Sequence, residues 1–307
     1  MRKNKILALC LSALMVAGLA GCGGSSSTAS STASSASSAA GSTASSAAAE
    51  APDGDGDPTT LTVAMECAYA PYNWTQTDDS NGAVQIRDSS DYAYGYDVMM
   101  AKKIAEALGQ EVQIVKLDWD SLVPAVMSGD VDCVIAGQSI TSERAQQVDF
   151  SDPYYYASIV TLVKKDSPYA SAASVADLAG ATCTSQLGTI WYDICLPQIE
   201  NANILPAQET APAMLVALDS GACDIVVTDR PTAQAALVAY PDFQLLDFGG
   251  GEGDFAVSDE EINIGISLKK GNTALKDAIN EVLSTMTTDD YNAMMDEAIE
   301  AQPLNQG

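Results

Sequence analysis

The 307-residue chain has no histidine, and its 14 basic residues are far fewer than its 41 acidic ones. Histidine is the commonest general base and the commonest metal ligand, so its absence removes the usual candidates for both roles. We therefore expect no metal and no cofactor. The net charge of −27 at pH 7 creates a field that repels phosphate backbones. Nucleic acid is accordingly not expected as a partner.

Cysteine is also sparse, with two residues near the N-terminus and five in the body. The spacings of the five match no zinc-binding pattern. Cys133 and Cys223 lie in apolar runs, so we expect buried free thiols there. The most plausible disulfide joins Cys183 to Cys195, although the sequence leaves the pairing open. The five body cysteines are Cys67, Cys133, Cys183, Cys195 and Cys223.

The apolar run nearest the N-terminus has the layout of a signal peptide. A basic start with Arg2 precedes the apolar residues 6–17, and the small residues of Leu19-Ala20-Gly21-Cys22 follow. The apolar stretch is too short for a permanent membrane span. The last four residues resemble the lipobox of bacterial lipoproteins, which implies cleavage after residue 21 and lipidation of Cys22, including palmitate. The alternative is an ordinary cleavage site with a chance cysteine.

Residues 22–58 form the predicted tether. Residues 23–49 are almost all Ser, Ala, Gly and Thr, so they offer no apolar face to bury and should form a flexible linker. No later stretch is apolar enough to span a bilayer. The sequence thus predicts a folded body from Thr59 onward, tied to the extracytoplasmic face of the cell membrane by a lipid anchor.

Strands and amphipathic helices alternate along the body, which predicts an α/β fold built from βαβ units. In the helix expected at 120–128, Leu122 and Met127 should face inward. Expected strands are 61–65, 112–117, 131–136, 181–184 and 224–228. Expected helices are 96–108, 120–128, one from Trp191, 212–219, 273–285 and 290–299.

The pattern occurs twice. Residues 128–135 and 220–227 both run from a helix end through a turn into a buried strand. We interpret this repetition as two lobes of similar architecture. Gly137 and Asp229 then fall at matching positions beyond the carboxyl ends of their strands, where open α/β sheets place ligands. A cleft between the lobes is the expected binding site.

From about Leu61 to Ile299 the body resembles family 3 extracellular solute-binding proteins, the receptors of polar amino-acid ABC importers. The resemblance implies a two-lobed type II periplasmic-binding-protein fold, of the Venus-flytrap kind. Lobe I would hold residues 59–155 and 263–307, and lobe II residues 156–262, with crossings near 155–156 and 262–264. The chain departs from the family at Ile190, where many members have Thr, and in a longer loop at 77–94. The matching segments are 69–72, 95–98, 119–124, 137–144, 148–154, 186–189 and 228–229.

The resemblance also implies a site. Arg144 would bind a ligand carboxylate through its planar fork, and Asp229 would bind the ammonium. Two aromatic residues would flank the ligand, and polar residues would meet its side chain. Alternatively, Arg144 forms a surface ion pair with Glu143 or Asp149, Asp229 caps a helix before Pro231, and the aromatics belong to the rim or core. The implied ligand-binding residues are Glu66, Tyr69, Trp119, Gly137, Gln138, Ser139, Arg144, Gln186, Gly188, Thr189 and Asp229.

The function implied is that of a receptor and not of an enzyme. The protein would be a monomer that captures a polar amino acid and delivers it to an ABC permease. Glu66 favours a cationic or amide side chain, but the residues do not name the ligand. Two alternatives stay open, namely a lyase of the same fold acting on an amino-acid-like acid, and a sensor that reports to another membrane protein.

Overall fold

The structure is a computed structural model that describes residues 57–258 and 262–303. The predictions for the signal peptide, for Cys22 and for residues 23–56 of the tether fall outside these residues. Within the described part of the chain, no helix has both the length and the apolar character needed to cross a membrane.

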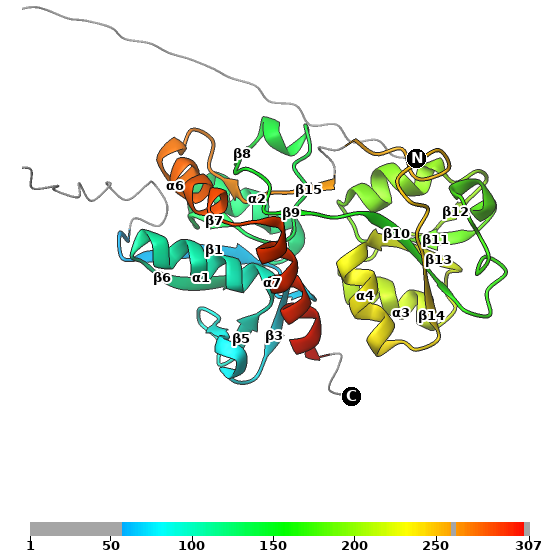
Figure 1. Cartoon of the computed structure of the whole chain (residues 1–307), viewed down its shortest axis with the longest axis horizontal. Coiled ribbons are helices and arrows are strands. Elements are labelled where there is room, and N and C mark those ends of the chain that lie inside the picture. The colour runs from blue at the N-terminus through cyan, green and yellow to red at the C-terminus, as the bar shows by residue number, and fades with distance from the viewer. Residues whose placement is uncertain (1–56, 259–261, 304–307) are drawn as a thin grey trace, which may run out of the picture. The chain divides into compact units, whose positions relative to one another are not determined.

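A five-stranded mixed sheet of order β6-β1-β7-β16-β8 organises the part of the body that we call lobe I, to which both the beginning and the C-terminal end of the body contribute (Figure 1). Strand β1 runs parallel to β6 and β7, whereas β16 runs antiparallel to β7 and β8. Helix α1 packs against β6, α6 and α7. The elements are β1 (Thr60–Met65), α1 (Tyr96–Leu108), β6 (Glu111–Lys116), α2 (Trp119–Ser128), β7 (Cys133–Val134), η2 (Arg144–Gln146), β8 (Asp149–Phe150), β16 (Ser267–Leu268), α6 (Thr273–Ser284) and α7 (Thr288–Ala301).

Helix α1 has the predicted bounds because glycines delimit it at both ends. Gly95 has φ +128°, and a Cβ there would lie 2.4 Å from the carbonyl oxygen of Tyr72. At the other end, the left-handed Gly109 donates its N–H to the carbonyl oxygens of Ala105 and Glu106. Between them, Val98 and Ile104 are fully buried on the face that meets the sheet.

Two predictions for lobe I need correction. Met127 is 43% exposed, because the buried face of α2 holds Leu122, Ala125 and Val126, and residue 127 points away from it. The strand expected at 131–136 pairs only over Cys133–Val134. Residues 135 and 136 remain fully buried without belonging to a strand, so the apolar run reflects burial more than pairing.

A second five-stranded sheet, of order β12-β11-β13-β10-β14, organises lobe II. Strand β11 runs parallel to β12 and β13, and β10 runs antiparallel to β13 and β14. The helix expected from Trp191 is a π-helical turn, η4, followed by a 3₁₀ turn, η5. The elements are β10 (Ile159–Lys164), η3 (Val175–Leu178), β11 (Thr182–Thr184), η4 (Trp191–Cys195), η5 (Leu196–Gln198), β12 (Asn203–Ile204), α3 (Ala211–Asp219), β13 (Ile225–Asp229), α4 (Arg230–Ala239) and β14 (Phe243–Leu246).

The chain passes between the two sheets at β9 (Tyr155–Tyr156) and β15 (Asn263–Ile264), which pair antiparallel. The long loop at 77–94 contributes to a small sheet beside lobe I, and Ile86 bridges to Ile114 on β6. The lobe limits given above remain predictions. The small sheet contains β2 (Ala68–Tyr69), β3 (Asn73–Gln76), β4 (Val84–Gln85) and β5 (Tyr92–Tyr94), with η1 at Ser80–Gly82.

The expected disulfide between Cys183 and Cys195 does not form, because Cys183 is a free thiol. It lies fully buried on β11, whereas Cys195 is buried at the end of η4. The predicted buried free thiols at Cys133 and Cys223 are confirmed. Burial raises the pKa of the Cys223 thiol to about 12, which keeps it protonated and unreactive at neutral pH.

Candidate ligand-binding site

Strand ends from both lobes supply the predicted site residues. Glu66 follows β1 in lobe I, whereas Asp229 ends β13 in lobe II. Parallel neighbours end at the same sheet edge, so each lobe gathers its polar loops at one place. Seven of the predicted residues, together with Ile190 and Trp191, line an inner cavity of about 10 Å³, which is room for about one water molecule. Its lining is Tyr69, Trp119, Gly137, Ser139, Arg144, Gln186, Thr189, Ile190 and Trp191.

Arg144 spans the cleft. Its Nη1 donates to the carbonyl oxygen of Ser139 at 2.9 Å, and its Nη2 donates to that of Gly188 in lobe II, also at 2.9 Å. Its guanidinium carbon lies 5.5 Å from the ring centroid of Trp119, within cation–π range. Burial lowers the pKa of Arg144 to about 10, so the group stays cationic at neutral pH. Among the described residues, Arg144 forms no ion pair with Glu143 or Asp149.

Asp229 has two kinds of partner. Oδ1 accepts from the backbone N–H of Thr232 at 2.9 Å, and Oδ2 accepts from the Thr232 hydroxyl at 3.0 Å, so Asp229 is the N-cap of α4. The capping role considered above is therefore present. Oδ2 also accepts from the hydroxyl of Tyr69 at 2.5 Å. Burial raises the pKa of Asp229, while the bonds from Thr232 and Tyr69 act in the opposite direction.

Glu66 and Gln186 meet across the cleft. The amide nitrogen of Gln186 lies 3.4 Å and 3.3 Å from the two carboxylate oxygens of Glu66. Burial raises the pKa of Glu66 to about 7. Gln138 takes no part in the contact between Glu66 and Gln186, because its Oε1 accepts from the hydroxyl of Ser267 at 2.9 Å. Thr189 uses its hydroxyl to donate to the carbonyl oxygen of Gln186 at 2.7 Å, which stabilises the turn.

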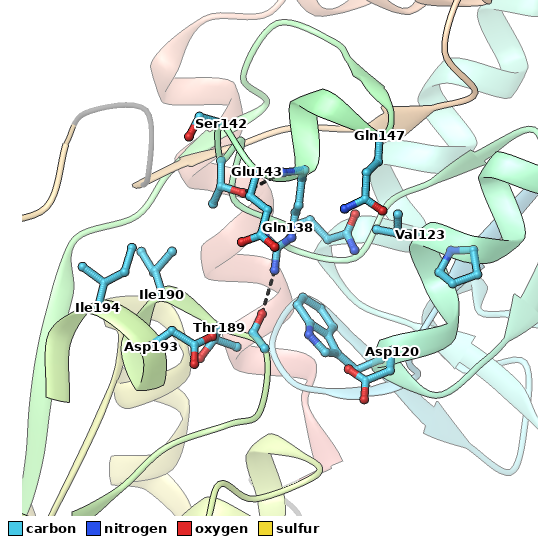
Figure 2. A pocket seen from close by; sticks show the side chains of 15 residues that line it. Asp120, Val123, Gln138, Ser142, Glu143, Gln147, Thr189, Ile190, Asp193 and Ile194 are labelled. Carbon is cyan, nitrogen blue, oxygen red and sulfur yellow. Dashed lines mark hydrogen bonds between the residues drawn. The ribbon is translucent and has the colours of Figure 1, made fainter. Parts of the chain in front are cut away.

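A larger outer cavity of about 490 Å³ adjoins the inner one and shares Trp119, Arg144, Thr189 and Ile190 with it. Figure 2 shows Ile194 and Asp193 on one side of this cavity, and Val123 and Gln147 on the other. Three carboxylates line it beside Arg144. Its lining is Trp119, Asp120, Val123, Pro124, Gln138, Thr141, Ser142, Glu143, Arg144, Gln147, Gly188, Thr189, Ile190, Asp193 and Ile194.

A buried network holds Gly137 in place. Its N–H donates to the Tyr154 hydroxyl at 3.0 Å, and that hydroxyl donates to Oδ1 of Asp97 at 2.7 Å. Asn73 donates to Oδ2 of Asp97 at 2.7 Å. Gly137 has φ +63°, and a Cβ there would lie 2.6 Å from the ring of Tyr69, so only glycine fits. The network fixes both the loop and the distance to the aromatic ring.

The residues predicted for the site do not include two that line the inner cavity, Ile190 and Trp191. Trp191 is 7% exposed, and its ring centroid lies 6.1 Å from that of Tyr69. The sequence does offer a signal, since this tryptophan comes two residues after Thr189, but the sequence pattern assigns it only to the start of a helix. No cluster of three or more Cys, Asp and Glu side chains suited to a metal occurs in residues 57–258 and 262–303.

Known proteins resemble this chain in sequence and in fold. The probable histidine-binding protein of Campylobacter jejuni is 32% identical over 201 residues, which are 64% of this chain and 71% of that protein. The substrate-binding protein of an amino acid ABC transporter superposes with a TM-score of 0.64 at 28% identity, over 78% of this chain and 99% of that one. An ancestral amino-acid-binding protein, AncCDT-1, is described as a precursor of cyclohexadienyl dehydratase. It superposes with a TM-score of 0.63 at 30% identity, over 78% of this chain and 96% of that one.

The two-lobed fold predicted from the sequence is confirmed by these structures. The model of one protein family matches residues 61–300, nearly the whole described body. The chain belongs to the bacterial extracellular solute-binding proteins, family 3.

Proposed function

We propose that the protein captures a polar amino acid outside the cytoplasmic membrane and delivers it, as a monomer, to the permease of an ABC importer. The observation that carries this proposal is the pairing of a guanidinium on lobe I with a carboxylate on lobe II, separated by aromatic rings. Arg144 lines the cleft, and Asp229 is joined to it through Tyr69. An amino acid carries the two complementary charges.

The arrangement supports binding by closure. Arginine has five N–H donors, and two of those of Arg144 bond to the carbonyl oxygens of Ser139 and Gly188. The remainder suit a carboxylate. Asp229 would take the ammonium once the lobes separate and its hydrogen bond from the Tyr69 hydroxyl is broken. Because the two charges are held by different lobes, a bound zwitterion favours the closed form over the open one.

The test is a calorimetric panel of the twenty amino acids and cystine, followed by Asp229→Asn with the best ligand. Asparagine is as good an N-cap as aspartate, so α4 should stay intact while the negative charge is lost. Truncating one member of a buried charge pair costs about 2–5 kcal/mol, so we expect roughly 30-fold or greater loss of affinity. Asp247→Asn, which removes a surface carboxylate paired with Arg230, is the control. Absence of binding by every amino acid would refute the proposal.

We further propose that a lipid on Cys22 anchors the protein to the outer face of the membrane. The lipobox-like residues at 19–22 and the Ser/Ala-rich tether support this. Cys22→Ala should therefore appear in the medium or periplasm instead of the membrane fraction. If the variant still sediments with membranes and is released only by detergent, the anchor lies elsewhere.

A lyase is the second candidate, because AncCDT-1 is described as the precursor of a dehydratase. We propose that this protein is no enzyme, since binding and closure need no covalent step. Incubation of the best ligand with the protein, followed by mass spectrometry, tests this. Turnover of the ligand would favour the lyase.

A further inference from the structure

We propose that Trp191 determines which ligands the cleft accepts, and that it favours amino acids with small polar side chains. This inference rests on the proposed function and concerns the same site. It assigns a specificity role to a residue that the sequence interpretation did not include in the site.

Trp191 lines the lobe II side of the inner cavity, together with Gln186, Thr189 and Ile190. It is the first residue of η4, which packs against β13. Its ring faces Tyr69 of lobe I at 6.1 Å and an angle of 55°. Both lobes therefore present an aromatic ring to the same small space.

The opposite wall cannot retreat. The ring of Tyr69 stacks on that of Tyr72 at 4.7 Å, and Tyr72 is fully buried. Gly137 closes a further side, with room for no Cβ between it and Tyr69. Well-packed interiors resist such displacement, so at the end of the inner cavity away from the outer one a ligand gains space mainly on the side of Trp191.

The inner cavity holds about 10 Å³, so a side chain entering it competes directly with the indole. Every ligand side chain must enlarge this space, and a large one must displace the indole further than a small one. Glu66 is not among the residues that line either cavity, and its carboxylate already meets Gln186. Selection by size at Trp191 therefore outweighs selection by charge at Glu66, and Gln186 supplies polar contact for a small side chain.

The experiment measures dissociation constants for serine and threonine against arginine and histidine. The wild-type protein should bind the small pair at least tenfold more tightly. Trp191→Ala should reduce or reverse this ratio by at least tenfold, and Trp191→Phe, which preserves an aromatic core, should change it less but in the same direction. Tyr192→Phe is the matched control, because this neighbour lines neither cavity and its hydroxyl donates to the carbonyl oxygen of Leu205.

The outcomes separate the two proposals. If amino acids bind but the wild-type protein prefers the large pair, or if the ratio is the same in folded Trp191→Phe, the role of Trp191 is refuted and the receptor function stands. If no amino acid binds the wild-type protein, the proposed function itself fails, and this inference with it. Should Trp191→Ala not fold, Trp191→Phe decides the question alone.

Discussion

The hydroxyl of Tyr69 in lobe I donates a 2.5 Å hydrogen bond to Oδ2 of Asp229 in lobe II. This is the carboxylate expected to receive the ligand ammonium. Two further contacts cross the cleft, from Arg144 to the carbonyl oxygen of Gly188 and from Gln186 to Glu66. The protein's own groups thus occupy Asp229, so a ligand ammonium has to replace the contact from Tyr69, whereas a ligand carboxylate can use the remaining donors of Arg144.

Tyr69→Phe should therefore raise ligand affinity. The substitution keeps the ring that faces the cavity and removes the hydroxyl that competes for Asp229. A net hydrogen bond is worth about 0.5–1.5 kcal/mol, so we expect roughly a two- to tenfold tighter Kd by calorimetry.

Tyr72→Phe is the control for this change. Its ring stacks on the same tyrosine, and its buried hydroxyl has no hydrogen-bond partner in the described part of the chain. Affinity should not change in this variant. Weaker binding by Tyr69→Phe alone would mean that the Tyr69 hydroxyl contacts the ligand or orients Asp229, which contradicts the competition.

Glu66 should make the protein less stable as pH rises. Burial raises its pKa from 4.5 to about 7 in the folded state, so the folded protein binds this proton more tightly than the unfolded chain does. Its stabilising contribution is fully present below pH 4.5 and is lost as pH rises through 7. The shift corresponds to about 3 kcal/mol.

Glu66→Gln should remove that decline in the free energy of unfolding, measured by urea denaturation at pH 5 and pH 8. Asp97, whose pKa burial also raises to about 7, contributes a similar slope in both proteins, so the difference between them isolates Glu66. Equal slopes in the wild-type and Glu66→Gln proteins would show that Glu66 ionises normally.

Gly95→Ala should be strongly destabilising. A methyl group there would meet the backbone oxygen of Tyr72 at 2.4 Å, and the positive φ adds about 1–2 kcal/mol. Gly109→Ala is the matched control, since Gly109 also has positive φ but no atom within 4 Å of its Cβ position. Thermal unfolding should show a clearly larger loss for Gly95→Ala. Similar losses in the two variants would rule out the steric clash.

Local patterns predicted the helices and strands well, because burial periodicity and glycine stops act over short distances. Helix α1 has its predicted bounds, and the free thiols at Cys133 and Cys223 follow from their apolar runs. The failures have tertiary causes. Met127 fits an apolar helix pattern, yet its direction depends on which side of α2 meets the sheet.

In the site, too, the residue types could be predicted from the sequence, whereas their tertiary contacts could not. The residue types that carry the site, such as Arg144 in η2 and Asp229 at the end of β13, follow from the family resemblance. The partners they have in the structure do not, because contacts such as Tyr69 to Asp229 join residues 160 positions apart. Trp191 was missed for the same reason, since its role depends on the ring of Tyr69 that faces it.

Arg144 should be irreplaceable by lysine in ligand binding. The guanidinium donates to the carbonyl oxygens of Ser139 and Gly188 in two directions, lies over Trp119, and has further donors for a carboxylate. An ammonium is a point charge without this fork, so Arg144→Lys should weaken binding nearly as much as Arg144→Ala, by roughly 30-fold or more. Arg87→Lys is the control, because the exposed Arg87 donates to Gln113 and lines neither cavity. This variant should leave the calorimetric Kd unchanged. If Arg144→Lys binds the best amino acid as tightly as the wild-type protein, a positive charge alone is enough to bind the carboxylate. The prediction that the guanidinium binds it bidentately would then be wrong.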